Sequence, residues 1–201
     1  NGRCATVKSA LNDARHAEGA GGQMVTVHGR TRKQGYKCAD EYATIAAVKA
    51  ALRIPVVANG DIDAPHKAQA VLRATGADAL MIGRAAQGRP WVFREIAHYL
   101  NTGALLAPPL VLEVRRALLA HLQDHYGLYG EFTGVRSARK HIGWYVRDLP
   151  GGDAFRARMN GIDSAPLQWQ LVADYFEELA DGHERLPTAL ADQPTGALEA
   201  R

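Results

Sequence analysis

Apolar runs and helical patterns alternate along the first hundred residues of the chain. Mostly apolar runs at residues 24–27, 54–58 and 79–82 predict short buried strands. Apolar side chains recur at helical spacing around these runs, which predicts helices over residues 5–18, 41–52, 64–74 and 91–100. Alternating strands and helices are typical of an α/β fold built on a parallel sheet. Three strands make only part of a closed eight-stranded barrel or of a doubly wound sheet, and the pattern leaves both open.

The strand signals stop after Gly103 and the Pro108-Pro109 pair. Helical patterns continue over residues 110–126, 133–148, 153–160 and 165–181. We therefore expect an α/β part over residues 1–104, a small helical domain over 108–181 and a loose tail over 182–201. The tail is rich in Ala, Pro and Gly and has no apolar periodicity.

The composition narrows the class of protein. Of 201 residues, 47% are hydrophobic and 22% charged, which fits a globular protein and excludes a disordered or collagen-like one. No run reaches the ~18 apolar residues of a membrane span, and the first ten residues lack the apolar core of a secretory signal. Two cysteines, Cys4 and Cys38, are too few for a disulfide framework. These features predict a cytoplasmic protein without membrane contact.

The start of the chain predicts that it is a fragment. The sequence opens on Asn1, its first methionine is Met24, and a helical pattern begins almost at once. We therefore expect a longer protein of which this chain is one part.

Charge is unevenly distributed along the chain. Residues 163–201 carry a net charge of −6, so that residues 1–162 carry +9 within the overall value of +3. A basic body favours a polyanionic partner such as nucleic acid, although many soluble proteins share this balance.

Each predicted strand ends in a glycine flanked by polar side chains. These ends are His28-Gly29-Arg30, Asn59-Gly60-Asp61 and Gly83-Arg84. Glycine lets the backbone approach a ligand, and parallel α/β folds bind ligands at the carboxyl ends of their strands. The second and third ends suit a phosphate group, with Arg84 as a fixed cation. The alternative is that the glycines only make tight turns and that His28 is a core histidine.

Histidine spacing gives no sign of a metal site. Among eight histidines, only His121 and His125 have a ligand-like i, i+4 spacing, and no acidic or cysteine partner follows them. We interpret this pair as part of a helix surface and expect no metal.

The predicted helix over residues 133–148 has one basic face and one apolar face. At about 100° per residue, Arg136, Arg139, Lys140 and Arg147 fall in one arc. No acid stands at i±4 on this face, where it would pair with these side chains. The arc therefore favours binding to a phosphate backbone, with a merely solvated face as the alternative. Trp144 borders the arc and could stack on a base or pack against a neighbouring helix.

Four stretches of the sequence resemble the carboxyl-terminal part of bacterial tRNA-dihydrouridine synthases of the B-type branch. They are VTVHGRTR (25–32), IPVVANGDI (54–62), TGADALMIGRAAQGRPWVFREI (75–96) and GVRSARKHIGWY (134–145). The resemblance runs from about residue 10 to residue 180. It implies about the last three strands of an FMN-binding TIM barrel over residues 1–104, followed by a helical tRNA-binding domain over residues 108–181. Such enzymes reduce the 5,6 double bond of uridines in tRNA, and NADPH reduces the flavin.

The resemblance also implies roles for single residues. Asn59, Gly60, Asp61, Gly83 and Arg84 match the family's FMN-phosphate loops, and His28 matches a histidine beside the flavin. Tyr36 is carried over to the uridine pocket, and Arg30, beside His28 at the end of a strand, is expected to bind substrate or tRNA. Arg136, Arg139 and Lys140 match the basic helix offered to tRNA.

The chain lacks the family's proton donor, a cysteine in an Asn-x-x-Cys-Pro context on an earlier strand. Neither Cys4 nor Cys38 stands in that context. We therefore expect no catalytic residue in this chain, a missing amino-terminal half of the barrel and no activity of the chain alone. Two alternatives remain, a non-catalytic RNA-binding module derived from the family and a different FMN or phosphate-sugar barrel.

Overall fold

The apolar runs form strands in a computed structural model of the chain, which describes residues 2–29 and 42–187. They are β1 (Val25–His28), β2 (Val56–Asn59) and β3 (Ala79–Met81). The strands pair in parallel in the order β1-β2-β3, which confirms the α/β prediction.

Helices precede, join and follow these strands. They are α1 (Gly2–Gly19), α2 (Tyr42–Ala51), α3 (Pro65–Thr75), the short 3-10 helix η1 (Arg84–Ala86) and α4 (Val92–Thr102). Helix α3 begins on a proline and ends at Gly76, and α4 ends at Gly103. Both glycines adopt the left-handed conformation that closes a helix, with their N–H groups bonded to the last turn.

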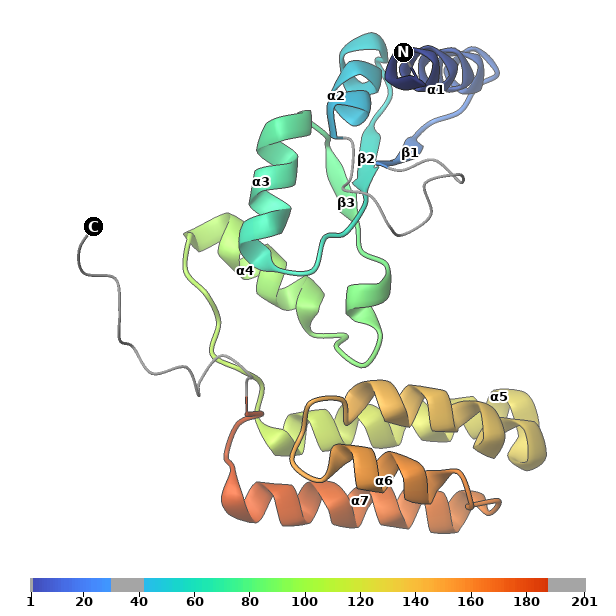
Figure 1. Cartoon of the computed structure of the whole chain (residues 1–201), viewed down its shortest axis with the longest axis vertical. Coiled ribbons are helices and arrows are strands. Elements are labelled where there is room, and N and C mark those ends of the chain that lie inside the picture. Colours follow the sequence, from blue (N-terminus) through green and yellow to red (C-terminus); the bar gives the residue numbers. More distant parts are fainter. Residues whose placement is uncertain (1, 30–41, 188–201) are drawn as a thin grey trace. The chain divides into compact units, whose positions relative to one another are not determined.

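The helices cover one face of the sheet. The core of this part joins side chains of α1 to α4 with Val56 and Ala58 of β2, while Val25, Val27 and Leu80 pack against it. Figure 1 shows α3 lying alongside β2 and β3. One-sided cover with neighbouring strands in sequence order fits part of a (β/α)8 barrel, whereas a doubly wound sheet carries helices on both faces.

The other face of the sheet carries two rows of side chains set by the strand register. Thr26, Val57 and Ala79 are register partners in one row. In the second row, His28 is exposed and Met81 is 47% exposed.

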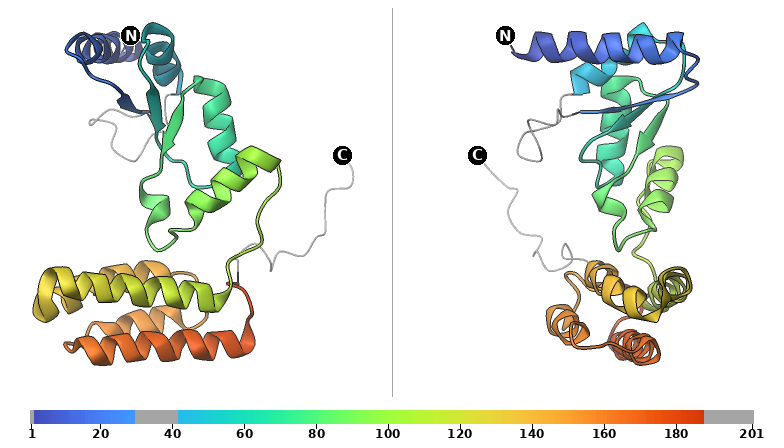
Figure 2. Two further views of the ribbon diagram at one scale, coloured as in Figure 1. Left: turned by 180° about the vertical axis from the view of Figure 1, so that it is seen from behind. Right: turned by 90° about the vertical axis from the view of Figure 1, so that its right-hand side faces the viewer.

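A second compact unit spans Ala107–Arg201, and the first spans Asn1–Leu106. Its helices are α5 (Val111–Tyr145), α6 (Gly152–Met159) and α7 (Ala165–Gly182). Helix α5 is two helices in one, because Gly130 has φ 71° and ψ 168°, which no helix contains. In Figures 1 and 2 its two arms, residues 111–129 and 131–145, run side by side in opposite directions.

Apolar side chains of both arms pack against α6 and α7. The fully buried side chains of this core include Leu118, Leu122 and Ile142 of the arms, Met159 of α6 and Phe176 of α7. Gln168 of α7 is also fully buried and satisfied, because it accepts a hydrogen bond from the Tyr126 hydroxyl (2.7 Å) and donates one to the Val135 carbonyl (3.3 Å). This unit therefore has a core of its own.

The first residues of the predicted tail, 184–186, hydrogen-bond to residues 108–111 at the start of α5. Leu110 and Arg185 form an antiparallel bridge, and the Val111 N–H donates to the Glu184 carbonyl at 3.0 Å. Residues 188–201 lie outside the described residues. No helix within the described ranges has the length and apolar character needed to cross a membrane.

Candidate functional site

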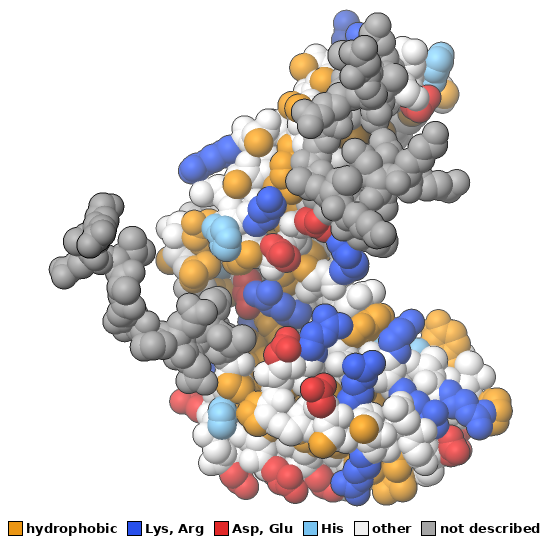
Figure 3. Space-filling model, viewed as in Figure 1, with side chains coloured by type: hydrophobic (Ala, Val, Ile, Leu, Met, Phe, Trp, Pro, Cys, Tyr) orange, Lys and Arg blue, Asp and Glu red, His pale blue; other side chains and the backbone are white. Residues whose placement is uncertain are grey.

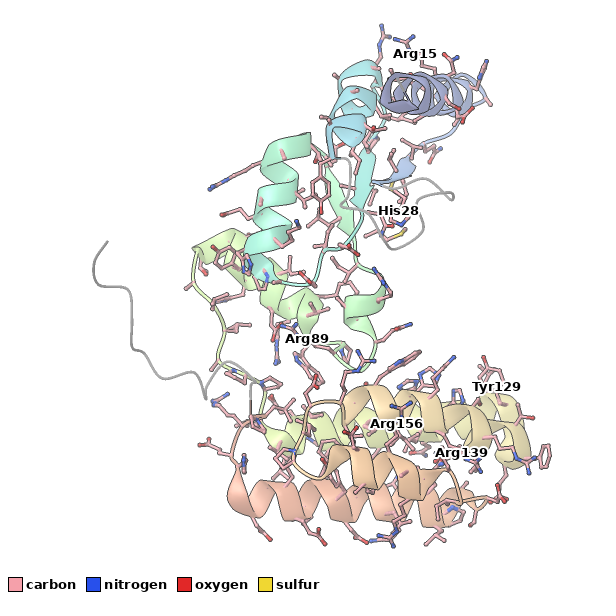
Figure 4. All side chains as sticks on the ribbon, in the orientation of Figure 1. Arg15, His28, Arg89, Tyr129, Arg139 and Arg156 are labelled. Atoms are coloured by element: carbon pink, nitrogen blue, oxygen red, sulfur yellow. The ribbon has the colours of Figure 1, made fainter. Side chains whose placement is uncertain are left out.

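The carboxyl ends of the three strands meet at one edge of the sheet. Register pairs His28 with Asn59 and Asn59 with Met81. The Asn59 side-chain amide donates to the Met81 carbonyl at 2.8 Å, and the Gly29 N–H donates to the Asn59 carbonyl at 2.8 Å. The His28 side chain is exposed, which excludes the core-histidine interpretation (Figure 4).

The turn after β2 is strained. Gly60 has φ 146° and Asp61 has φ 38°, a positive value that costs a non-glycine residue about 1–3 kcal/mol. The Tyr42 hydroxyl donates to the Gly60 carbonyl at 3.0 Å, and the Asp61 carboxylate binds the Arg84 guanidinium at 2.6 Å. These contacts hold a turn that the backbone alone does not favour.

Arg84 lies at the start of the next loop. Its side chain is 57% exposed and forms the ion pair with Asp61, so the two predicted phosphate loops touch. No atom lies within 4 Å of where a side chain on Gly83 would begin, which leaves the backbone open to a ligand. Asn59, Gly60, Asp61, Gly83 and Arg84 thus lie together, as the strand ends predict.

Arg89 is a residue of this edge that the sequence reasoning did not single out. Its guanidinium donates to the Asp63 carbonyl (3.2 Å) and pairs with Glu95 (2.5 Å). Arg89 therefore ties the loop after β2 to the start of α4 (Figure 4). Arg89 lies within the stretch over residues 75–96 that carries the family resemblance, and this position could have drawn attention to it. Arg30 and Tyr36 lie outside the described residues.

A pocket of about 350 Å³ opens on the second unit. It is lined by Arg136, Arg139, Lys140, Gly143, Trp144, Arg147, Arg156 and Asn160. The first six come from the second arm of α5 and its end, and the last two from α6 and its end. Figure 3 shows Lys and Arg side chains gathered on this unit. The packing of the two elements therefore adds Arg156 to the basic arc.

Two arginines of the pocket share an acidic partner. Asp163, just before α7, binds Arg139 at 2.7 Å and lies 3.8 Å from Arg136. Arg139 also donates to the Ile162 carbonyl at 2.8 Å and is only 22% exposed. The face lacks acids at i±4, yet tertiary folding brings one to it, so Arg139 has a structural contact as well.

Because Gly143 has no side chain, the Arg156 side chain of α6 can pass close to the second arm of α5. The Arg156 side chain lies 3.2 Å from where a Cβ on Gly143 would stand. The pocket thus depends on a glycine in the helix. The Lys140 ammonium lies 5.2 Å from the ring centroid of the Trp144 indole. The same indole packs edge-to-face against the imidazole of His141.

The histidine pair is not a surface pair. His125 is buried, and His141 of the second arm joins His121 and His125. The interpretation of the pair as helix surface is therefore wrong for His125, and a third histidine, 16 residues further along the chain than His125, joins the pair.

The comparisons with known proteins agree on one family. The family model described as dihydrouridine synthase (Dus) matches residues 5–180. The chain is 55% identical over 179 residues to a tRNA-dihydrouridine synthase B of Xanthomonas axonopodis, covering 89% of this chain and 53% of that protein. It is 54% identical over 171 residues to the protein of the same name from Pseudomonas putida, covering 85% of this chain and 51% of that protein. The chain thus spans about half the length of the curated relatives it matches.

Proposed function

The chain belongs to the dihydrouridine synthase (Dus) family, and on that premise we propose that it is the carboxyl-terminal part of a tRNA-dihydrouridine synthase. The observation that carries the proposal is the pocket on the second unit. Five cationic side chains around one depression of about 350 Å³ favour a polyanion as its ligand. The names of the relatives make tRNA the polyanion to test.

We assign residues 1–104 to the end of an FMN-binding barrel, residues 108–181 to a tRNA-binding domain and residues 182–201 to a tail. The residues at the strand edge fit the phosphate of FMN. Arg84 offers an exposed guanidinium, and the backbone at Gly83 is open to close approach. Asn59, Gly60 and Asp61 complete the edge, and His28 at the end of β1 is available to the same ligand.

When bound, the flavin supplies hydride chemistry after reduction by NADPH. The chain's own residues would position and hold the cofactor's phosphate. Tyr36 is assigned to the uridine pocket, and Arg30 to substrate or tRNA binding. The proton donor is assigned to a cysteine on a strand that this chain does not contain, so we expect the chain alone to be inactive.

The basic pocket would supply the energy for RNA binding. Moving a uridine out of its stack costs a few kcal/mol, which contacts to the phosphate backbone can offset. Lys140, Arg147 and Arg156 are the cations whose charge Asp163 does not neutralise. Arg136 and Arg139 belong to the same pocket, with Arg139 also holding the loop before α7.

The proposed activity is tested on the product of the complete gene. Reading the DNA upstream of the codon for Asn1 should reveal an open frame that encodes an Asn-x-x-Cys-Pro strand. The complete product, given FMN, NADPH and an unmodified tRNA transcript, should form dihydrouridine, detected by mass spectrometry of the digested RNA. Tight tRNA binding with no dihydrouridine would contradict the enzyme proposal.

That outcome would favour the second candidate, a non-catalytic RNA-binding module. The observation in its favour is that every residue lining the basic pocket lies in the second unit, at residues 136–160. A different FMN or phosphate-sugar barrel would bind flavin but show no preference for tRNA.

A further inference from the structure

Three imidazole rings meet between the two arms of α5. His121 and His125 lie one turn apart on the first arm, and His141 lies on the second. A ring nitrogen of each lies within 4.8 Å of one on both of the others. The ring centroid of His141 is 4.9 Å from that of His121 and 5.1 Å from that of His125. The hairpin at Gly130 is what brings these three side chains together.

A serine determines which nitrogen of His125 is free. The Ser137 hydroxyl donates its one hydrogen to the Thr133 carbonyl at 2.7 Å and lies 2.7 Å from His125 Nε2. The hydroxyl oxygen therefore accepts a hydrogen bond from Nε2, and the lone pair of the neutral ring lies on Nδ1. Metal-bound histidines are commonly held this way, with the second ring nitrogen donating to a polar partner.

Burial lowers the pKa of two of the three imidazoles, those of His125 and His141. It lowers the pKa of His125, and the nearby cationic forms of His121 and Lys140 lower it further. The pKa of His141 falls to about 4, again mainly through burial. The neutral ring is the form that binds metal ions. Within the described parts of the chain, no side chain or backbone group hydrogen-bonds the ring nitrogens of His121 or His141.

We propose that His121, His125 and His141 form a binding site for a first-row transition-metal ion, with Zn²⁺ as the expected occupant. Imidazole is a preferred ligand of zinc, and three histidines leave a fourth tetrahedral position for water. A Zn–N bond of about 2.0–2.1 Å requires the nitrogens to approach to about 3.4 Å. His121 and His141 are half-buried and can rotate to close that distance, while Ser137 holds His125.

A metal at this place would link the two arms of α5. One ligand lies on the arm that carries Arg136 and Lys140, and two lie on the other. Binding would therefore stabilise the folded hairpin over its open form. The inference stands apart from the proposed function, because it concerns the core side of the hairpin and needs neither FMN nor tRNA.

The experiment titrates the metal-free chain with ZnCl₂ by calorimetry and with CoCl₂ by visible absorption. We expect one ion per chain, tetrahedral cobalt absorption and a higher melting temperature with zinc. Ser137→Ala should weaken binding by about 10–100-fold, and His141→Gln by at least as much. His66→Gln is the matched control, because His66 is exposed on α3, and it should bind as the wild type does.

The proposal is overturned if wild-type chain shows no saturable one-to-one binding. It is equally overturned if His141→Gln binds like the wild type, or if His66→Gln loses as much affinity, since either result means adventitious surface binding. Circular dichroism checks that each variant is folded. If His141→Gln is not folded, zinc binding by His121→Gln and Ser137→Ala decides the proposal instead.

Discussion

At the scale of single residues, Arg84 and Asp61 form a pair that a phosphate would compete for. The Arg84 guanidinium lies 2.6 Å from the Asp61 carboxylate, yet more than half of its side chain is exposed. An exposed ion pair contributes little to stability, about 0–1 kcal/mol. An exposed guanidinium of this kind suits a ligand-binding role.

We expect Arg84→Ala to weaken FMN binding by about 10- to 100-fold, because a hydrogen bond to a charged group contributes about 1.5–3 kcal/mol. Quenching of flavin fluorescence during titration of the complete gene product measures this affinity. Arg73→Ala is the control, since Arg73 is an exposed arginine in the last turn of α3, at the opposite end of the βα unit. Unchanged affinity in Arg84→Ala would argue against the phosphate role.

Asp78 directly precedes β3 and links the amino end of β2 to α2. Its carboxylate accepts hydrogen bonds from the Lys49 ammonium (2.7 and 2.8 Å) and the Val56 N–H (2.8 Å), and both lower its pKa below the usual 3.8. The folded state thus binds fewer protons than the unfolded state. Its stabilising contribution is complete above pH 3.8 and is lost as the pH falls through the folded pKa.

Asp78→Asn should therefore flatten the loss of stability between about pH 5 and pH 2. Urea unfolding midpoints at several pH values measure this slope. Asp13→Asn removes an exposed carboxylate of α1 that pairs with no described residue, and it should keep the wild-type slope. Parallel slopes for wild type and Asp78→Asn would refute the assigned role.

At the scale of elements, the turn at Gly130 decides how α5 is used. Helical residues continue on both sides of it, and only the backbone of this residue departs, at φ 71° and ψ 168°. That region is essentially restricted to glycine. One residue therefore converts a 35-residue helical segment into a hairpin that places His141 beside His121.

Gly130→Ala should lower the free energy of unfolding by about 1–3 kcal/mol, because alanine is strained in this conformation. Gly127→Ala should raise it by about 0.5–1 kcal/mol, since Gly127 is helical and nothing lies within 4 Å of the added methyl group. Chemical unfolding of both variants compares two identical substitutions three residues apart. The same sign for both would contradict the assigned turn.

At the scale of the whole molecule, charge is separated between segments that fold against one another. The acidic end of the sequence includes Asp163, which lies against the basic arm of α5. This single acid neutralises part of the arc and leaves Arg147, which pairs with no described residue, as an exposed cation of the pocket. The affinity for RNA should accordingly depend on the net charge of the pocket and on the salt concentration.

We expect Arg147→Ala to weaken tRNA binding several-fold and to reduce the slope of log affinity against log salt by about 0.7–1, because one phosphate contact is lost. Fluorescence anisotropy at several salt concentrations gives both values. Arg116→Ala removes an exposed arginine of the first arm outside the pocket and serves as the control. Equal effects of the two substitutions would mean that only net charge matters.

The sequence by itself determined the features that depend on near neighbours. Apolar runs and helical spacing located the strands and helices, and the polar glycine ends of the strands predicted where Asn59, Asp61 and Arg84 would meet. These predictions succeed because parallel strands align their carboxyl ends whatever the rest of the fold does.

Only the tertiary structure decided which distant side chains meet. Asp163 reaches Arg139 across 24 residues, and His141 joins His125 across 16, through a turn that the helical periodicity does not reveal. Periodicity reports which face of a helix is buried and carries no information on what packs against it. The partners of Arg139 and of the histidines therefore follow from the packing of whole helices.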